Sequence, residues 1–167
     1  WDIIKSTIRC LAHSEGVELF YLGHLTALAA AESDERTGLE RIMSEMGGLV
    51  QELNITIHLV SHLATPDGKP HEEGGRVMIR HFKGSRSIGF WCFTMIGLER
   101  DQQAEDLAHR NVTVVRILKH RPVGAAVGEV IYYRYDGVTG RLDEMDEDPF
   151  AEDSNASNPF HDQTSDF

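Results

Sequence analysis

Apolar residues recur along the chain at two spacings, one typical of helices and the other typical of strands. Over residues 1–13 and 35–53 they return every three or four positions, so that one face of each segment is apolar. These spacings predict two amphipathic helices, the second weakened near its end by Gly47-Gly48. A loop or short helix is expected over residues 24–34.

Short runs of β-branched and aromatic residues, bounded by turn residues, have the pattern of strands. They lie at 17–22, 55–60, 77–82, 112–118 and 130–135, and a further apolar run ends at Glu99-Arg100. Strand, helix, strand over 17–60 is the unit that builds a parallel sheet. The last two runs would form an antiparallel pair at its edge. We therefore predict an α/β fold with a mostly parallel, twisted sheet and an antiparallel edge.

Residues 54–103 hold the first candidates for chemistry. The run 55–60 stops at Ser61-His62 and opens into a loop rich in Gly and Pro over 63–76. In α/β proteins, ligands bind where buried strands end and long loops begin. His62, the loop that carries Lys69, and the turn 83–86 are the candidates that this rule selects.

Composition places the unusual charge at one end of the chain. The 167 residues suit one domain, and the formal net charge is −11. Residues 143–167 hold nine of the 27 acidic side chains and none of the 16 basic ones, so the remainder is close to neutral. We predict a folded domain over 1–142, no packed structure after Leu142, and a disordered acidic tail over 143–167.

Other sequence features narrow the class of protein. No apolar run approaches the roughly 20 residues of a membrane helix, and the first residues lack the features of a signal peptide. Cys10 and Cys92 fall in apolar segments and are expected to be buried free thiols. His58 and His62 share a strand face, and with His24 they could suggest a metal site. No third ligand stands at a fixed spacing, so no metal site is predicted.

Several short motifs follow one another in an order that is specific. They are LGHLTAL, SHLATPDGKPHEEG, KGSRSIG, LERDQQ, VRILKHR and an acidic tail that ends in Phe. Together they make the chain resemble the helicase half of the T-odd-phage replicative helicase–primases, hexameric motors of the DnaB/RecA-like family. The resemblance covers 1–142 and the final residues. It implies the C-terminal portion of a RecA-like P-loop NTPase core.

Two departures from the family pattern concern the phosphates of the nucleotide. No G-x-x-x-x-G-K-[ST] motif, which supplies the phosphate cradle, occurs in the chain. Gly23 stands where the family has the Asp that orders the Mg²⁺ shell. The resemblance implies Mg²⁺ and ATP or dTTP for the full-length family. We expect neither to bind tightly to this chain alone, and no hydrolysis by it.

The resemblance also implies catalytic and base-binding roles for particular residues. His62 would sense the γ-phosphate; otherwise it is a capped histidine at a strand end. Arg121, with Lys119 beside it, would be an arginine finger that acts on the neighbouring subunit; otherwise the two are a surface basic pair. Arg100 and Tyr135 would sandwich the adenine base; otherwise Tyr135 is a sheet-edge aromatic.

Five residues are candidates for contact with DNA. Lys69 and Arg76 belong to a loop that composition predicts to be mobile. They would contact DNA phosphates; the alternative is a solvated loop without a binding role. Lys83, Gly84 and Ser85 form the turn that the family uses for DNA, where backbone N–H groups and a basic side chain suit a phosphate.

Function and partners follow from the same resemblance. The chain would be part of a replicative helicase that couples NTP hydrolysis to 5′→3′ translocation on single-stranded DNA, in a homo-oligomeric, hexameric ring. Asp166 and Phe167 would dock the replicative DNA polymerase; a solubilising tail is the alternative. The cytoplasm of the infected bacterial host is the expected location. The rival hypothesis is a non-catalytic remnant that binds DNA or polymerase.

Overall fold

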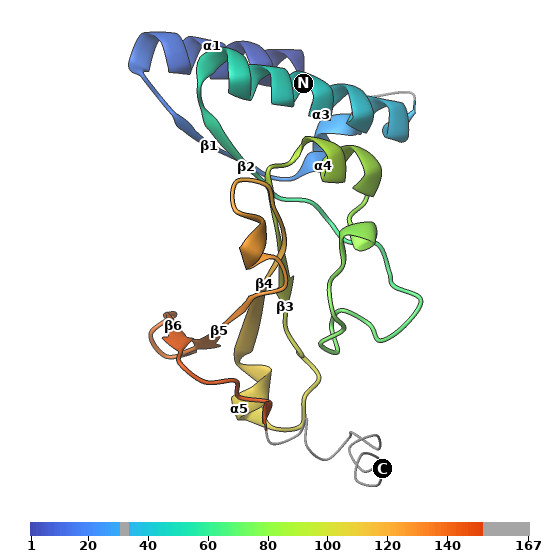
Figure 1. Cartoon of the computed structure of the whole chain (residues 1–167), viewed down its shortest axis with the longest axis vertical. Coiled ribbons are helices and arrows are strands. Elements are labelled where there is room, and N and C mark those ends of the chain that lie inside the picture. The colour runs from blue at the N-terminus through green and yellow to red at the C-terminus, as the bar shows by residue number, and fades with distance from the viewer. Residues whose placement is uncertain (31–33, 152–167) are drawn as a thin grey trace, which may run out of the picture.

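The computed structural model describes residues 1–30 and 34–151 as helices, strands and connecting loops (Figure 1). The helical elements are α1 (Asp2–Glu15), α2 (Leu25–Ala29), α3 (Glu35–Leu53), α4 (Ser85–Trp91) and α5 (Leu107–Arg110), with 3-10 turns η1 (Ile79–His81) and η2 (Gly124–Ala126). The strands are β1 (Leu19–Leu22), β2 (Thr56–Leu59), β3 (Thr94–Glu99), β4 (Val112–His120), β5 (Val130–Tyr135) and β6 (Leu142–Met145). The expected mixed α/β class is therefore present.

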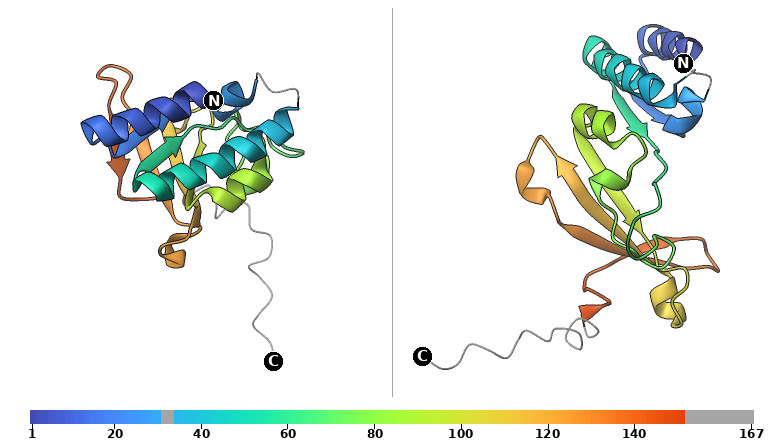
Figure 2. Two further views of the ribbon diagram at one scale, coloured as in Figure 1. Left: turned by 90° about the horizontal axis from the view of Figure 1, so that it is seen from above. Right: turned by 90° about the vertical axis from the view of Figure 1, so that its right-hand side faces the viewer.

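Helices α1 and α3 cover a parallel pair formed by β1 and β2 (Figure 2). Asp34 caps the start of α3 by accepting the Arg36 N–H at 3.1 Å, and Asn54 ends it in the left-handed conformation with φ of 53°. Gly47 does not break the helix. A Cβ there would lie 2.5 Å from the Trp91 ring, so the glycine allows α4 to approach α3 closely.

The remaining strands form an antiparallel sheet in the order β3-β4-β5-β6. The predicted pairing of the two late strands is confirmed, with Val114 opposite Tyr132. The pair is not at the sheet edge, because β3 and β6 flank it. Parallel pairing is confined to β1 and β2 in the described ranges 1–30 and 34–151, so the sheet is less parallel than expected.

The prediction that packed structure ends at Leu142 is wrong for the residues that follow it. Strand β6 pairs with β5, and Tyr133 stands opposite Glu144. Hydrogen bonds along the edge of β5 order this acidic stretch despite its composition. Residues 152–167 of the expected disordered tail lie outside the described residues.

Two segments of the central stretch differ from the strand prediction. Over 77–82 the chain forms η1, because side chains satisfy its backbone: Val77 N–H donates to Glu99 Oε1 at 2.9 Å and Met78 N–H to His81 Nδ1 at 3.2 Å. The apolar run after Gly84 begins as α4 and only becomes β3 at Thr94.

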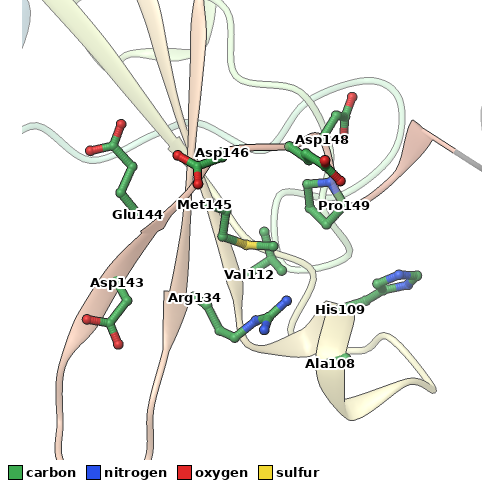
Figure 3. A pocket seen from close by; sticks show the side chains of 11 residues that line it. Ala108, His109, Val112, Arg134, Asp143, Glu144, Met145, Asp146, Asp148 and Pro149 are labelled. Atoms are coloured by element: carbon green, nitrogen blue, oxygen red, sulfur yellow. The ribbon is translucent and has the colours of Figure 1, made fainter.

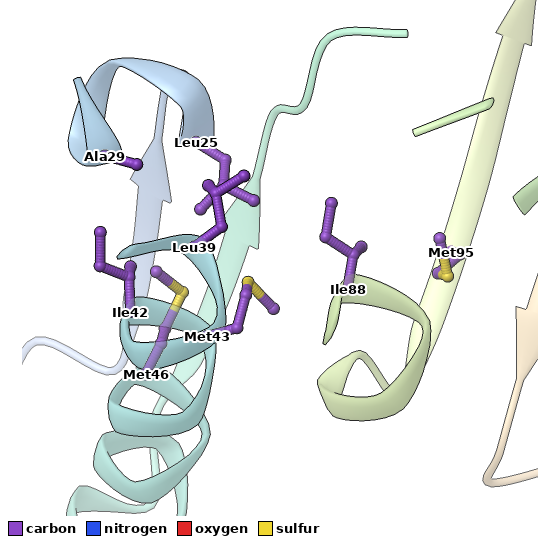
Figure 4. Close-up of a cluster of buried hydrophobic side chains, with 8 residues drawn as sticks. All are labelled: Leu25, Ala29, Leu39, Ile42, Met43, Met46, Ile88 and Met95. Atoms are coloured by element: carbon purple, nitrogen blue, oxygen red, sulfur yellow. The ribbon is translucent and has the colours of Figure 1, made fainter. Parts of the chain in front are cut away.

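Most of the buried side chains form two neighbouring clusters under α1 and α3. The larger one joins α2, α3, α4 and β3 (Figure 4), and it consists of Leu25, Ala29, Leu39, Ile42, Met43, Met46, Ile88 and Met95. The smaller one holds Ile8, Phe20 and Ile55. Cys10 is exposed, contrary to prediction, because it lies on the outer face of α1; Cys92 is half-buried, and burial raises the pKa of its thiol. No helix among the described residues is long and apolar enough to span a membrane.

Candidate nucleotide and nucleic-acid site

Two histidines meet where the parallel strands end. His24 follows β1 and His62 follows β2, and their ring centroids are 4.1 Å apart. His24 is held in place by its role as N-cap of α2, where its Nδ1 accepts the Ala27 N–H at 3.3 Å and lies 2.7 Å from Thr26 Oγ1. The His62 side chain is exposed beside it. The sequence pattern suggested His24 only as a metal ligand, and that role was rejected. Its position directly after a strand is the signal that could have identified it as a site residue.

The backbone of His62 holds the turn that follows η1. Lys83 N–H donates to the His62 carbonyl at 3.1 Å, and a bridge between Leu63 and Phe82 continues this pairing. Gly84 has a φ of 81°, and a Cβ there would lie 3.0 Å from the Leu39 side chain. Lys83 is exposed, while the Ser85 side chain is not described. The structure thus brings His62 and the 83–85 turn together.

Lys119 and Arg121 both reach the C-terminal end of α4. Lys119 Nζ donates to the Gly89 carbonyl, and Arg121 donates to the Phe90 carbonyl at 2.6 Å. The Arg121 guanidinium also lies 5.8 Å from the centre of the Phe93 ring. Burial and the neighbouring Arg121 lower the pKa of Lys119. These two cations and His62 therefore flank opposite ends of α4, a helix of seven residues and about 10 Å.

The loop that carries Lys69 is folded on itself, although its composition predicts mobility. Gly75 N–H donates to the Pro70 carbonyl at 2.9 Å, and Gln102 N–H to the Glu72 carbonyl at 2.9 Å. A Cβ on Gly75 would lie 2.1 Å from the Lys69 carbonyl oxygen, so only glycine fits there. Lys69 is exposed and pairs with Asp101 at 3.6 Å.

A pocket of about 400 Å³ gathers several cations from this loop and the antiparallel sheet. Lys69, Arg76, Arg100 and Arg116 line it, together with Glu99. The Arg116 guanidinium donates two hydrogen bonds to the Glu99 carboxylate, at 2.8 and 2.9 Å. These hydrogen bonds raise the pKa of Arg116. Arg76 remains exposed at the rim.

Arg100, which directly follows β3, and Tyr135 of β5 are brought into contact. The guanidinium carbon lies 5.6 Å from the centre of the Tyr135 ring. Arg100 is fixed by donating to the Arg110 carbonyl at 2.8 Å and to Asn111 Oδ1 at 3.2 Å.

The end of β1 does not suit Mg²⁺. Gly23 offers no side-chain oxygen, and the groups beside it are the imidazoles of His24 and His62, whereas Mg²⁺ prefers oxygen ligands. Nothing lies within 4 Å of a Cβ built on Gly23, so space for a larger side chain exists. Within residues 1–30 and 34–151, no group of three or more His, Cys, Asp or Glu is placed to hold a metal ion.

A pocket of about 660 Å³ near α5 shares His109 and Val112 with the pocket of about 400 Å³, but none of the candidate residues lines it (Figure 3). Asp143, Glu144, Asp146 and Asp148 contribute acidic groups to its wall, so it is a poor site for phosphates. Phe150 at the start of the tail lies 5.2 Å from the His109 ring. Asp166 and Phe167 lie outside the described residues.

Comparison with known proteins identifies the kind of protein. No family model matches the chain. It is 34% identical over 131 residues to the DNA helicase/primase of Enterobacteria phage T3, a match that covers 77% of this chain and 22% of that protein. The chain thus spans less than a quarter of this relative's length. The fold is similar to that of a KaiC-like protein of the archaeon Pyrococcus horikoshii, with a TM-score of 0.61 and 12% identity over 86% of this chain and 56% of that one. The chain therefore has a RecA-like α/β fold and belongs to the same family as a segment of the phage helicase–primases.

Proposed function

We propose that the chain is part of a replicative DNA helicase that couples NTP hydrolysis to 5′→3′ movement on single-stranded DNA. The observation that carries the proposal is the hydrogen bond of 3.1 Å from Lys83 N–H to the His62 carbonyl. His62 stands where two parallel strands end, the position at which α/β folds bind ligands. A change at the γ-phosphate that moves His62 would therefore move the DNA-contacting turn, residues 83–85, with it.

The nucleotide base would stack on Tyr135 beside Arg100, and Arg121 would complete a nucleotide site on the next subunit of a hexameric ring. Two observations support an action in trans. Arg121 is exposed, and it lies at the far end of α4 from His62. A guanidinium that serves the same phosphates as His62 within one chain would have to stand near it.

Hydrolysis requires parts that these 167 residues lack. We propose that ATP or dTTP with Mg²⁺ binds only once a phosphate loop and an acidic metal ligand are supplied from elsewhere, because the residues around Gly23 do not suit Mg²⁺. Asp166 and Phe167 would dock the replicative polymerase in the cytoplasm of the infected host. The rival, a non-catalytic remnant that binds DNA or polymerase, is favoured by Gly23.

Binding of single-stranded DNA tests the proposal. Fluorescence anisotropy of a labelled oligo-dT is expected to show binding that weakens with salt, and Lys83→Ala or Arg76→Ala should each lower the salt slope by about 0.7. Arg141→Ala removes the same charge from the distant β5–β6 hairpin and is the matched control. An absence of binding, or equal loss with Arg141→Ala, would remove DNA contact from the proposed function.

A further inference from the structure

Two histidines pack against each other where the loop that carries Lys69 meets η1. His71 belongs to the loop and His81 to η1, and their ring centroids are 5.0 Å apart with the ring planes at 58°. His81 is buried, with only 9% of its surface exposed. Neither residue has a part in the proposed function.

Hydrogen bonds to the backbone fix which nitrogen of each ring carries a proton. His71 Nδ1 lies 3.1 Å from the Gly75 carbonyl oxygen, which can only accept, so this nitrogen carries the proton. His81 Nδ1 accepts the Met78 N–H at 3.2 Å, so the proton of the neutral ring lies on Nε2. The two rings therefore hold opposite tautomers.

A second proton on either ring would conflict with its surroundings. On His81 it would occupy Nδ1 and face the Met78 N–H, so that hydrogen bond would be lost. On His71 it would occupy Nε2, which is buried and finds no hydrogen-bond partner in the described part of the chain. Two protonated rings 5.0 Å apart would also repel each other. The packed arrangement therefore suits neutral imidazoles.

The same two residues also hold the backbone of the loop. At its start, the His81 carbonyl accepts the Ala64 N–H at 2.6 Å. Near its end, the His71 ring binds the carbonyl of Gly75, whose own N–H donates to the Pro70 carbonyl at 2.9 Å. A change at the imidazole pair would therefore act on both ends of the loop.

We propose that the two imidazoles form a latch, which keeps the loop over residues 64–76 folded while both are neutral and opens it when His81 takes up a proton. Opening separates Lys69 from Asp101, with which it pairs at 3.6 Å, and allows Arg76 to move. The inference goes beyond the proposed function and rests on the geometry of the loop, so it survives if binding of DNA or nucleotide fails.

The direction of the pH effect follows from the groups around His81. Burial, the neighbouring His71 and Arg80 of η1 lower the pKa of His81 below its ordinary value of 6.5, and Asp67 of the loop opposes them. Because the closed loop binds the proton more weakly than the open loop, closure is fully favoured above pH 6.5 and loses stability as pH falls below it. For each pH unit below this value, the population of the open loop rises by up to about tenfold, until the closed ring is protonated too.

Hydrogen exchange of the loop amides, corrected for the intrinsic effect of pH on exchange, tests the latch. Between about pH 7.5 and about pH 5.5, the Ala64 and Gly75 amides should lose several-fold to about tenfold of their protection. The Ile88 amide in α4 should keep its protection. NMR signals of the His81 ring report its protonation, and their midpoint should coincide with that of the loop. Midpoints that differ would separate the loop from His81 and overturn the proposal.

Two variants sharpen the test. His81→Asn keeps an acceptor for the Met78 N–H, since an amide oxygen can replace Nδ1, but it takes up no proton in this range and should retain loop protection at both pH values. The matched control His13→Asn removes an exposed histidine of α1 and should leave the pH effect intact. Unchanged Gly75 protection in the unaltered chain would overturn the proposal. A loss in His81→Asn as large as in the unaltered chain, or a loss at Ile88 as large as at Gly75, would do the same.

Discussion

The helix-covered parallel pair and the antiparallel sheet differ in how far the chain covers its own apolar surface. Nearly all of the buried apolar residues belong to α1, β1, α2 and α3 or pack beneath them, and β3 and β4 contribute only Met95 and Val112 among the described residues. On β3, Ile96 and Leu98 are 49% and 66% exposed. The parallel half buries most of its apolar side chains beneath its helices, whereas the antiparallel half has exposed apolar faces that suit contact with further polypeptide.

The two halves are also held by different forces. Hydrophobic clusters stabilise the parallel half. In the antiparallel half, the Glu99 carboxylate ties three segments together, accepting Arg116 from β4 and the Val77 N–H before η1. The antiparallel sheet, at whose strand ends Arg100 and Arg121 stand, therefore has a buried polar contact of its own, whereas the parallel half is held by apolar packing.

The largest contrast should appear on truncating one side chain in each half. Ile42 is fully buried on α3, and Ile42→Ala should cost about 4 kcal/mol of unfolding free energy, through lost burial and the cavity it leaves. Leu98→Ala on the exposed face of β3 should cost about 0.5 kcal/mol or less. Urea denaturation measures both. Similar losses for the two variants would show that the halves are equally packed.

The next largest loss of stability is expected at the ion pair between Glu99 and Arg116 in the antiparallel half. Arg116→Ala should cost about 3 kcal/mol, because it leaves the buried Glu99 carboxylate without its bidentate partner. The double variant Arg116→Met with Glu99→Met should recover part of the loss, since both charges are then gone. A double variant less stable than Arg116→Ala would mean that the carboxylate is needed mainly to hold Val77.

A smaller effect is expected at the contact of α1 with α3. Lys5 first, and then Trp1, hold the pKa of Glu45 at about 2, below its ordinary value of 4.5. A depressed carboxyl pKa stabilises the fold above pH 4.5, and this stabilisation is lost as pH falls toward 2. Glu45→Gln should cost about 1 kcal/mol at pH 7 and nothing near pH 2. The control Glu40→Gln, on the same helix, should leave the unfolding free energy unchanged at both pH values. An equal loss at both pH values for Glu45→Gln would rule out the charge effect.

An effect of similar or smaller size than that of Glu45→Gln is predicted for Arg121→Gln. Its side chain is exposed and makes a hydrogen bond to Phe90, so unfolding free energy should change by about 1 kcal/mol or less. Thermal unfolding measures the change. A loss of several kcal/mol would make Arg121 a structural residue of α4 and weaken its proposed action on a neighbouring subunit.

Local patterns along the chain predicted some elements and missed others for identifiable reasons. The α3 helix was predicted over its whole length because its periodicity is local. The run 77–82 was wrongly predicted as a strand, because the Val77 N–H donates to the carboxylate of Glu99, 22 residues away, and not to a neighbouring strand. The prediction also missed that most of the strands pair antiparallel, because the direction of a strand relative to its neighbour depends on partners that are distant along the chain.

The candidate site shows the same division. The position of His62 after a strand could be predicted from the sequence. Its ring contact with His24 and the hydrogen bond from Lys83 N–H to its carbonyl could not, because both join segments that are distant along the chain. Likewise the spacing of Lys119 and Arg121 placed them together, but their carbonyl partners on α4 could not be read from spacing.

Nucleotide turnover by the chain, with Mg²⁺ and with and without single-stranded DNA, tests the central claim most directly. The claim is that these residues carry the strand ends and the DNA turn of a motor whose phosphate site is completed from elsewhere. The account predicts that labelled oligo-dT binds while ATP and dTTP are not hydrolysed. DNA-stimulated hydrolysis that His62→Ala abolishes would contradict it, because the chain would then hold a complete nucleotide site.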